Sequence, residues 1–184
     1  SVGGTSESYV DWAPGKTYIA GSVVSYQNAY YRVLTGHTAG IGEALTKEYI
    51  LAGNDVVGLS KREGNNIRNI PKICNQIEPC DMFINNAQAG YAQTELLFEM
   101  AVRWQGTGKR IIVISTMMTQ DAACNMLGLD MSEYYIQKCA LELAVKELRH
   151  RKLGIKFTIV RPGNIATDAS KSVPPATDVG VWAQ

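Results

Sequence analysis

The chain has 184 residues and a formal net charge of +1 at pH 7, which predicts one domain with room for a small appendage. This charge balance gives no reason to expect nucleic acid or an anionic membrane as a partner. No run of 18 apolar residues occurs and residues 1–11 lack a signal pattern, so we expect a cytoplasmic protein without a membrane span. Four cysteines without a CxxC pair, and two histidines far apart in the sequence, favour a reduced protein without a metal site.

Residues 1–34 differ in pattern from the rest of the chain. Short runs of aromatic residues and valine alternate with turn residues such as Pro14-Gly15 and Gln27-Asn28, which predicts short strands. The order of aromatic residues from Trp12 to Tyr31 resembles the small carbohydrate-binding modules of chitinases and the repeats of phage tail and fibre proteins. That resemblance implies rings that stack on sugars, whereas a tiny core, or packing on the main domain, is the alternative we favour. We therefore predict a short aromatic, β-rich appendage over residues 1–29.

A glycine-rich turn follows the apolar run at residues 30–34, which is either the first strand of the second domain or the last strand of the appendage. The turn has three glycines and opens a helix. Glycine permits positive φ and close approach of backbone N–H groups, so such a loop suits a phosphate group, although a plain tight turn is the alternative for this loop alone. The candidate cofactor-binding residues here are Gly36, Thr38, Gly40, Ile41 and Gly42.

Apolar residues at helical spacing from Ile41 to Ala52 predict a helix that ends at Gly53, and residues 55–60 predict a strand. Strand, loop, helix and strand form a βαβ unit with parallel strands. Lys61 and Arg62 lie just past the second strand, where dinucleotide folds read the adenosine ribose. Two cations at this position favour NADP, with NAD as the second choice, whereas an ordinary solvated basic pair is the alternative.

The alternation of strand and helix continues along the chain. Strands are expected at residues 66–68, 81–84 and 111–114, and helices at 70–77 and 96–104. The second of these strands runs into Asn85-Asn86-Ala87, and the third ends at Ser115-Thr116. We therefore predict an α/β fold, with a Rossmann-like, doubly wound parallel sheet of reduced size over residues 30–184.

Tyr134 and Lys138 are four residues apart at the start of a predicted helix and so share one face. A free tyrosine has a pKa of about 10, and a lysine ammonium beside it favours the phenolate and lowers that pKa. A hydroxyl from Ser115 or Thr116 can bond a substrate carbonyl. A tyrosine and a lysine at this spacing are common on helices and alone indicate nothing. The candidate catalytic residues are Tyr134, Lys138, Thr116 and Ser115.

Residues 30–168 resemble the short-chain dehydrogenase/reductase family through five motifs in the family's order. These are Thr35-Gly36-x-x-x-Gly40-Ile41-Gly42, Asn85-Asn86-Ala87, Ile114-Ser115-Thr116, Tyr134-x-x-x-Lys138 and Arg161-Pro162-Gly163-x-Ile165-x-Thr167. The resemblance implies a nicotinamide cofactor and an oxidoreductase that moves hydride to or from a carbonyl or alcohol carbon. It also implies a homo-oligomer, with the helix after Tyr134 at an interface.

The resemblance assigns roles along the cofactor as well. Tyr134 would be the acid–base group, and Lys138 would bond the nicotinamide ribose. The residues expected between the adenosine ribose and the nicotinamide carboxamide are Asn86, Ala87, Pro162, Gly163, Ile165 and Thr167.

The chain also departs from the family pattern. The interval from Thr116 to Tyr134 is long, which puts the reach of the hydroxyl in doubt. Gln88 replaces a glycine and Gln137 replaces a small hydroxyl residue. Residues 91–105 contain no asparagine to complete the family's proton relay, and the substrate loop and last strand are largely absent after residue 168.

Two other functions stay open beside the predicted NADP-dependent oxidoreductase of small carbonyl or alcohol substrates. One is a structural or carbohydrate-binding protein, of viral type, that carries a degenerate Rossmann scaffold; residues 1–34 and the missing relay asparagine favour it. The other is a regulator that binds the cofactor without chemistry.

Overall fold

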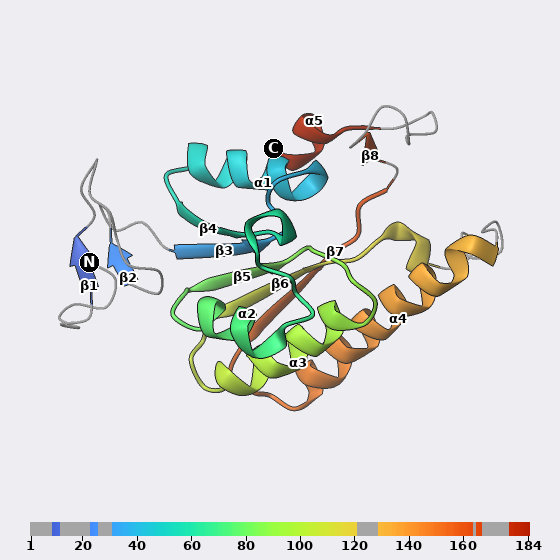
Figure 1. The fold of residues 1–184 in the computed structure, drawn as a ribbon. Coiled ribbons are helices and arrows are strands. Elements are labelled where there is room, and N and C mark those ends of the chain that lie inside the picture. The colour runs from blue at the N-terminus through green and yellow to red at the C-terminus, as the bar shows by residue number, and fades with distance from the viewer. Residues whose placement is uncertain (1–8, 12–22, 26–30, 121–128, 164, 167–176) are drawn as a thin grey trace.

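The structure is a computed structural model that describes residues 9–11, 23–25, 31–120, 129–163, 165–166 and 177–184. Its centre is a five-stranded parallel sheet in the order β4-β3-β5-β6-β7 (Figure 1). The strands are β3 (Tyr31–Thr35), β4 (Asp55–Leu59), β5 (Met82–Asn85), β6 (Arg110–Ile114) and β7 (Lys156–Val160). Two short parallel pairs lie outside this sheet: β1 (Tyr9–Asp11) with β2 (Val23–Ser25), and β8 (Ile165–Ala166) with β9 (Thr177–Asp178).

Helices cover both faces of the sheet (Figure 1). One face carries α1 (Gly40–Leu51), which the short α5 (Val179–Ala183) contacts. The other face carries α2 (Ile70–Ile77), α3 (Ala92–Arg103) and α4 (Leu129–His150). Two single turns of 3₁₀ helix, η1 (Lys61–Glu63) and η2 (Met117–Thr119), follow β4 and β6. The predicted class, an α/β fold with a reduced Rossmann-like parallel sheet, is confirmed.

The central strands are apolar on both faces because both faces are buried. On the side of α2, α3 and α4, strand residues such as Val33, Phe83 and Ile111 have no exposed surface. On the side of α1, Leu34 and Ile84 form a smaller cluster. The helical side chains that complete the larger core, each without exposed surface, are Ile73, Ile77, Leu96, Leu97, Met100, Leu141 and Val145.

Strand β3 is the point at which the strand order reverses. It pairs with β4 on one side and with β5 on the other, so the chain first moves from β3 out to the edge strand β4 and then returns across β3 to β5. In open α/β sheets, ligands bind at the carboxyl ends of the strands beside such a point. The alternative left open for residues 30–34 is thereby decided, because Tyr31–Thr35 belongs to the main sheet. The domain boundary between residues 29 and 30 stays a prediction.

The predicted strand over residues 66–68 is wrong. The chain passes from β4 through η1 and turns directly into α2. Asn66 Oδ1 accepts from the backbone N–H of Arg68 at 3.0 Å, and Asn69 Oδ1 accepts from Lys72 N at 3.4 Å, which caps α2. Asparagine side chains that bond nearby backbone in this way favour turns and helix starts over a strand ladder.

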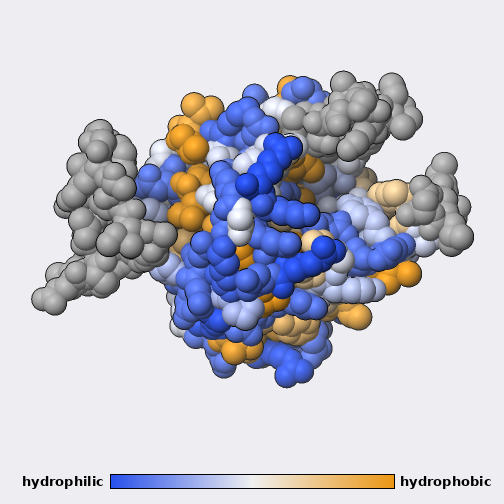
Figure 2. Space-filling view, in the orientation of Figure 1, coloured by the Kyte–Doolittle hydropathy of each residue, from blue (hydrophilic) through white to orange (hydrophobic). Residues whose placement is uncertain are grey.

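The face of the molecule shown in Figure 2 is mostly hydrophilic. An apolar patch marks the C-terminal end of α1, where Ile50 and Leu51 are 56% and 80% exposed. Within the described ranges, no helix combines the length and the apolar character needed to cross a membrane.

Two cysteines are part of the core. Cys74 and Cys80 are buried free thiols, and burial raises their pKa to about 11 and about 12. Both thiols are therefore protonated and unreactive near neutral pH. Cys139 is a free, partly buried thiol, and Cys124 lies outside the described residues.

We expect Gly42→Ala to destabilise the fold. A Cβ at Gly42 would overlap the carbonyl group of Gly36, and two backbone segments cannot move apart without disturbing the turn. The free energy of unfolding, measured by urea denaturation, should fall by about 2 kcal/mol or more. Gly53→Ala is the matched control: its φ is +82°, but its Cβ would meet nothing within 4 Å, so only backbone strain of about 1 kcal/mol applies. Equal losses in the two variants would contradict this account.

Candidate cofactor and catalytic site

The turn after β3 packs closely on the end of β5 at Gly36. Gly36 and Gly40 have φ values of 71° and 55°, in the left-handed region that favours glycine. A Cβ at Gly36 would lie 3.1 Å from the Asn86 amide nitrogen and 3.2 Å from the Ala87 Cβ. Among the described residues, no side chain caps the start of α1, so the first N–H groups of that helix are available to an anion there.

Thr35 and Asn86 join β3 to β5 at the point where the strand order reverses. The Thr35 hydroxyl accepts from the N–H groups of Asn86 and Ala87, both at 3.0 Å. The Asn86 amide donates to Thr35 O at 3.1 Å. The Asn86 side chain therefore holds the glycine turn in place. Its expected role at the adenosine ribose stays a prediction.

Lys61 and Arg62 are exposed on η1, directly after β4 and on the same side of the sheet edge as the glycine turn. Beside them, Ser60 Oγ donates to Glu63 Oε2 at 3.0 Å, and His37 Nε2 lies 3.4 Å from the same carboxylate. The two cations are not part of this bonded group, so their side chains extend into solvent beyond the end of β4.

Lys138 carries the most deeply buried charge in this part of the structure, with 3% of its surface exposed. Its ammonium donates to Gln93 Oε1 at 2.9 Å and to Ile114 O at 2.8 Å. Burial lowers the pKa of Lys138 from 10.5 to about 8, and the negative charge of Glu142 opposes that shift only in part.

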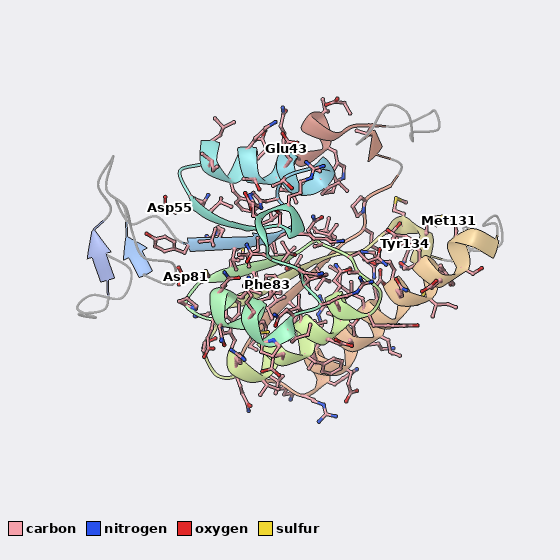
Figure 3. All side chains as sticks on the ribbon, viewed as in Figure 1. Glu43, Asp55, Asp81, Phe83, Met131 and Tyr134 are labelled. Atoms are coloured by element: carbon pink, nitrogen blue, oxygen red, sulfur yellow. The ribbon has the colours of Figure 1, made fainter. Side chains whose placement is uncertain are left out.

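Tyr134 is partly buried at the carboxyl-end edge of the sheet, while Asp55 and Asp81 mark the opposite edge (Figure 3). Thr116 lies close enough to Tyr134 to act on the pKa of the phenol, so the long interval between these residues does not keep them apart. Burial raises the pKa of Tyr134, and the Thr116 side chain opposes that rise. The expected lowering by Lys138 is absent, because the ammonium lies over the ring, 5.6 Å from its centroid, and bonds Gln93 and Ile114 instead.

Ser115 bonds a residue further along α4 than Tyr134. Its hydroxyl donates to Glu142 Oε1 at 2.6 Å, and Thr119 donates to the same oxygen at 2.7 Å. Arg161 holds Glu142 in a two-pronged ion pair at 3.0 and 2.8 Å. Burial acts to raise the pKa of Glu142, but these donors outweigh it and the pKa is lowered. The Ser115 hydroxyl is therefore held in a bonded cluster with Glu142 and Thr119.

The segment after β7 is held against the end of β6. The N–H of Met117 donates to the carbonyl oxygen of Pro162 at 2.9 Å, and Pro162 is buried while Gly163 is exposed. Ile165 begins β8, close in sequence to this contact. Thr167, the last predicted cofactor residue, lies outside the described residues.

Sequence reasoning missed two residues of this site, Gln93 and Glu142. Gln93 escaped notice because the family pattern places an asparagine in residues 91–105, although a glutamine carries the same amide on a longer side chain. Gln88 and Gln137 are the two departures from the family pattern, and they bond each other: the Gln88 amide donates to Gln137 Oε1. Two unusual residues that meet in space could have been paired from their amide chemistry alone.

The N-terminal part of the chain matches one known family. The model of carbohydrate-binding module family 5/12 matches residues 11–48, a stretch that runs past the appendage into β3 and the helix α1. The search of curated proteins found no match.

Solved structures of short-chain dehydrogenases resemble the chain over most of its length. A short-chain dehydrogenase from Burkholderia cenocepacia in complex with NADP is 15% identical with a TM-score of 0.68, covering 84% of this chain and 81% of that one. A bulky-bulky ketone specific alcohol dehydrogenase from Comamonas testosteroni is 18% identical with a TM-score of 0.66, covering 85% and 80%. A 3-ketoacyl-(acyl-carrier-protein) reductase from Brucella melitensis complexed with NADH is 12% identical with a TM-score of 0.67, covering 84% and 87%. At these identities the likeness establishes the fold.

The buried charge of Lys138 predicts a pH dependence of stability. Below about pH 8 the lysine is protonated in both the folded and the unfolded chain, and the cost of burying its charge is fully present. Between about pH 8 and 10.5 the unfolded chain binds this proton and the folded chain does not, so stability rises with pH. The free energy of unfolding of the wild type should gain up to about 1.4 kcal/mol per pH unit relative to Lys138→Met in this window. A difference that stays constant across the window would refute the assigned pKa.

Proposed function

We propose that the chain is an NADP-dependent oxidoreductase of short-chain dehydrogenase type that acts on a small carbonyl or alcohol compound. The observation that carries this proposal is the group of Tyr134, Thr116 and Lys138 at the carboxyl-end edge of the sheet. A phenol that lies near a hydroxyl and beside a buried ammonium is suited to moving a proton. The group lies at the same edge as the glycine turn, beside the reversal of strand order where dinucleotides bind in this architecture.

The residues fit a nicotinamide cofactor. The glycine turn leaves no space for a Cβ at Gly36 or Gly42, and the uncapped start of α1 offers N–H groups to a pyrophosphate. Lys138 uses two of its three N–H groups within the protein, which leaves one for a ribose hydroxyl of the nicotinamide half. The cofactor, once bound, supplies or accepts the hydride.

The side chains of the chain handle the proton. In the direction of reduction, the Tyr134 hydroxyl donates its proton to the substrate oxygen, and Thr116 bonds the same oxygen. Burial keeps Tyr134 protonated near neutral pH, the state in which a general acid donates. The phenolate that remains then lies beside the Lys138 ammonium, which is 5.6 Å from the ring centroid.

A second copy of the chain is the partner we propose for α3 and α4. These helices pack side by side, and each exposes two large apolar side chains on one face. Phe98 and Val102 are four apart on α3, and Ile136 and Leu143 are seven apart on α4, so each pair forms a stripe at helical spacing. Exposed apolar stripes of this kind are typical of an interface between subunits.

A second candidate function is the binding of carbohydrate by the N-terminal segment. The match of carbohydrate-binding module family 5/12 to residues 11–48 favours it. The aromatic residues that would stack on sugar, Trp12 and Tyr18, lie outside the described residues.

Preference for NADP rests on Lys61 and Arg62, which lie at the end of β4 where a 2′-phosphate would be bound. We expect the double variant Lys61→Ala/Arg62→Ala to bind NADPH about tenfold more weakly, with its affinity for NADH nearly unchanged. Fluorescence titration of the bound nicotinamide measures both affinities. Arg68→Ala, which removes an exposed arginine from the same connection, is the control and should change neither. An equal loss of both affinities would show that the two cations do not read the 2′-phosphate.

Turnover tests the proposed reaction directly. Purified protein is incubated with NADPH and a panel of aldehydes and ketones, and the loss of nicotinamide absorbance is followed. Tyr134→Phe should lower the rate on any accepted compound by at least about 100-fold, because the phenol supplies the proton. Ser115→Ala is the matched control, since Glu142 holds its hydroxyl, and it should retain the rate. Cofactor binding without turnover on the panel would instead favour a regulator that binds the nucleotide.

A further inference from the structure

Gln93 lies in the first turn of α3, and 2% of its surface is exposed. Its amide nitrogen donates to Asn85 O at 2.7 Å and to Ile114 O at 3.1 Å. Its amide oxygen accepts from the Lys138 ammonium at 2.9 Å. Every polar atom of this buried side chain is therefore bonded, and the three bonds reach β5, β6 and α4.

The orientation of the Gln93 amide is fixed by its partners. Carbonyl oxygens can only accept a hydrogen bond and an ammonium can only donate. Exchange of the amide oxygen and nitrogen would set acceptor against acceptor at Asn85 and Ile114, and donor against donor at Lys138. The backbone of Gln93 is held as well, because the Asn85 side-chain amide donates to its carbonyl oxygen at 2.8 Å.

These bonds determine where the ammonium of Lys138 can lie. One N–H points to Gln93 Oε1 and a second to Ile114 O, so the direction of the third is set by tetrahedral geometry. A lysine side chain has four rotatable bonds, and without Gln93 a single acceptor would leave it free to rotate. Among the described residues, no other side-chain acceptor lies at hydrogen-bond distance from the Lys138 ammonium.

We propose that Gln93 is a positioning residue that holds the Lys138 ammonium so that its third N–H meets the nicotinamide half of the cofactor. This inference rests on the proposed function, since it assigns the third N–H to the cofactor. A neutral amide suits this role, because it accepts from the ammonium and at the same time donates to two carbonyls. A carboxylate at the same place would keep the first bond and lose the other two.

The test compares two ligands in wild type and Gln93→Leu. NADPH carries both halves of the cofactor, and adenosine 2′,5′-bisphosphate carries only the adenosine half with its 2′-phosphate. Gln93→Leu should weaken NADPH about tenfold and leave the bisphosphate unchanged, because only the nicotinamide half meets Lys138. Gln137→Leu removes another buried amide that does not bond Lys138, and it is the matched control: the ratio of the two affinities should stay at the wild-type value.

A second variant keeps the inference testable if Gln93→Leu does not fold. Gln93→Glu retains the acceptor and adds a charge that favours the protonated lysine, so NADPH affinity should persist to a higher pH than in the wild type. Parallel weakening of both ligands in Gln93→Leu, or an unchanged pH profile in Gln93→Glu, would overturn the positioning role. Failure of the wild type to bind either ligand would overturn the proposed function as well, and is thus a distinct outcome.

Discussion

The site depends on one buried ammonium group. A charge removed from water is costly unless its hydrogen bonds are replaced, and Lys138 finds two acceptors in Gln93 Oε1 and Ile114 O. Those acceptors come from α3 and from the last residue of β6, so the charge can be buried only when both are packed against α4. The same packing lays the ammonium over the ring of Tyr134. The chemistry proposed for the phenol therefore follows from how a lysine is accommodated in the core.

The other half of the site is built from backbone. Thr35 and Asn86 exchange hydrogen bonds where β3 and β5 end, and this contact holds the glycine turn at the reversal of strand order. Close packing excludes side chains from Gly36 and Gly42, which keeps the start of α1 open to an anion. Although the sheet has only five strands and passes from β4 directly to α2, these bonded elements are present at the edge where a dinucleotide would lie. A reduced Rossmann-like fold can thus keep the parts that its proposed function needs.

Much of this could be predicted from the sequence because the determining patterns are local. Central strands apolar on both faces, a glycine turn before a helix, and Tyr134 and Lys138 four residues apart are all patterns that act over a few positions.

The failures of the sequence predictions are of two kinds. At residues 66–68 the asparagines bonded to nearby backbone and formed a turn where a strand was expected. At the site, the partners lie far apart in sequence: Gln93 and Lys138 are 45 residues apart, and burial by distant elements raises the pKa of Tyr134 where a neighbouring lysine was expected to lower it. Adjacent residues after β6 also meet different parts of α4, since Thr116 lies near Tyr134 while Ser115 bonds Glu142.

The most direct test of the central claim is a crystal structure of the chain grown with NADP⁺. We predict that the pyrophosphate lies on the N–H groups at the start of α1 and that the nicotinamide ring lies beside Tyr134. A ribose hydroxyl of the nicotinamide half should then accept a hydrogen bond from Lys138 Nζ. A nucleotide bound elsewhere on the surface, or a site that stays empty at saturating NADP⁺, would contradict the account.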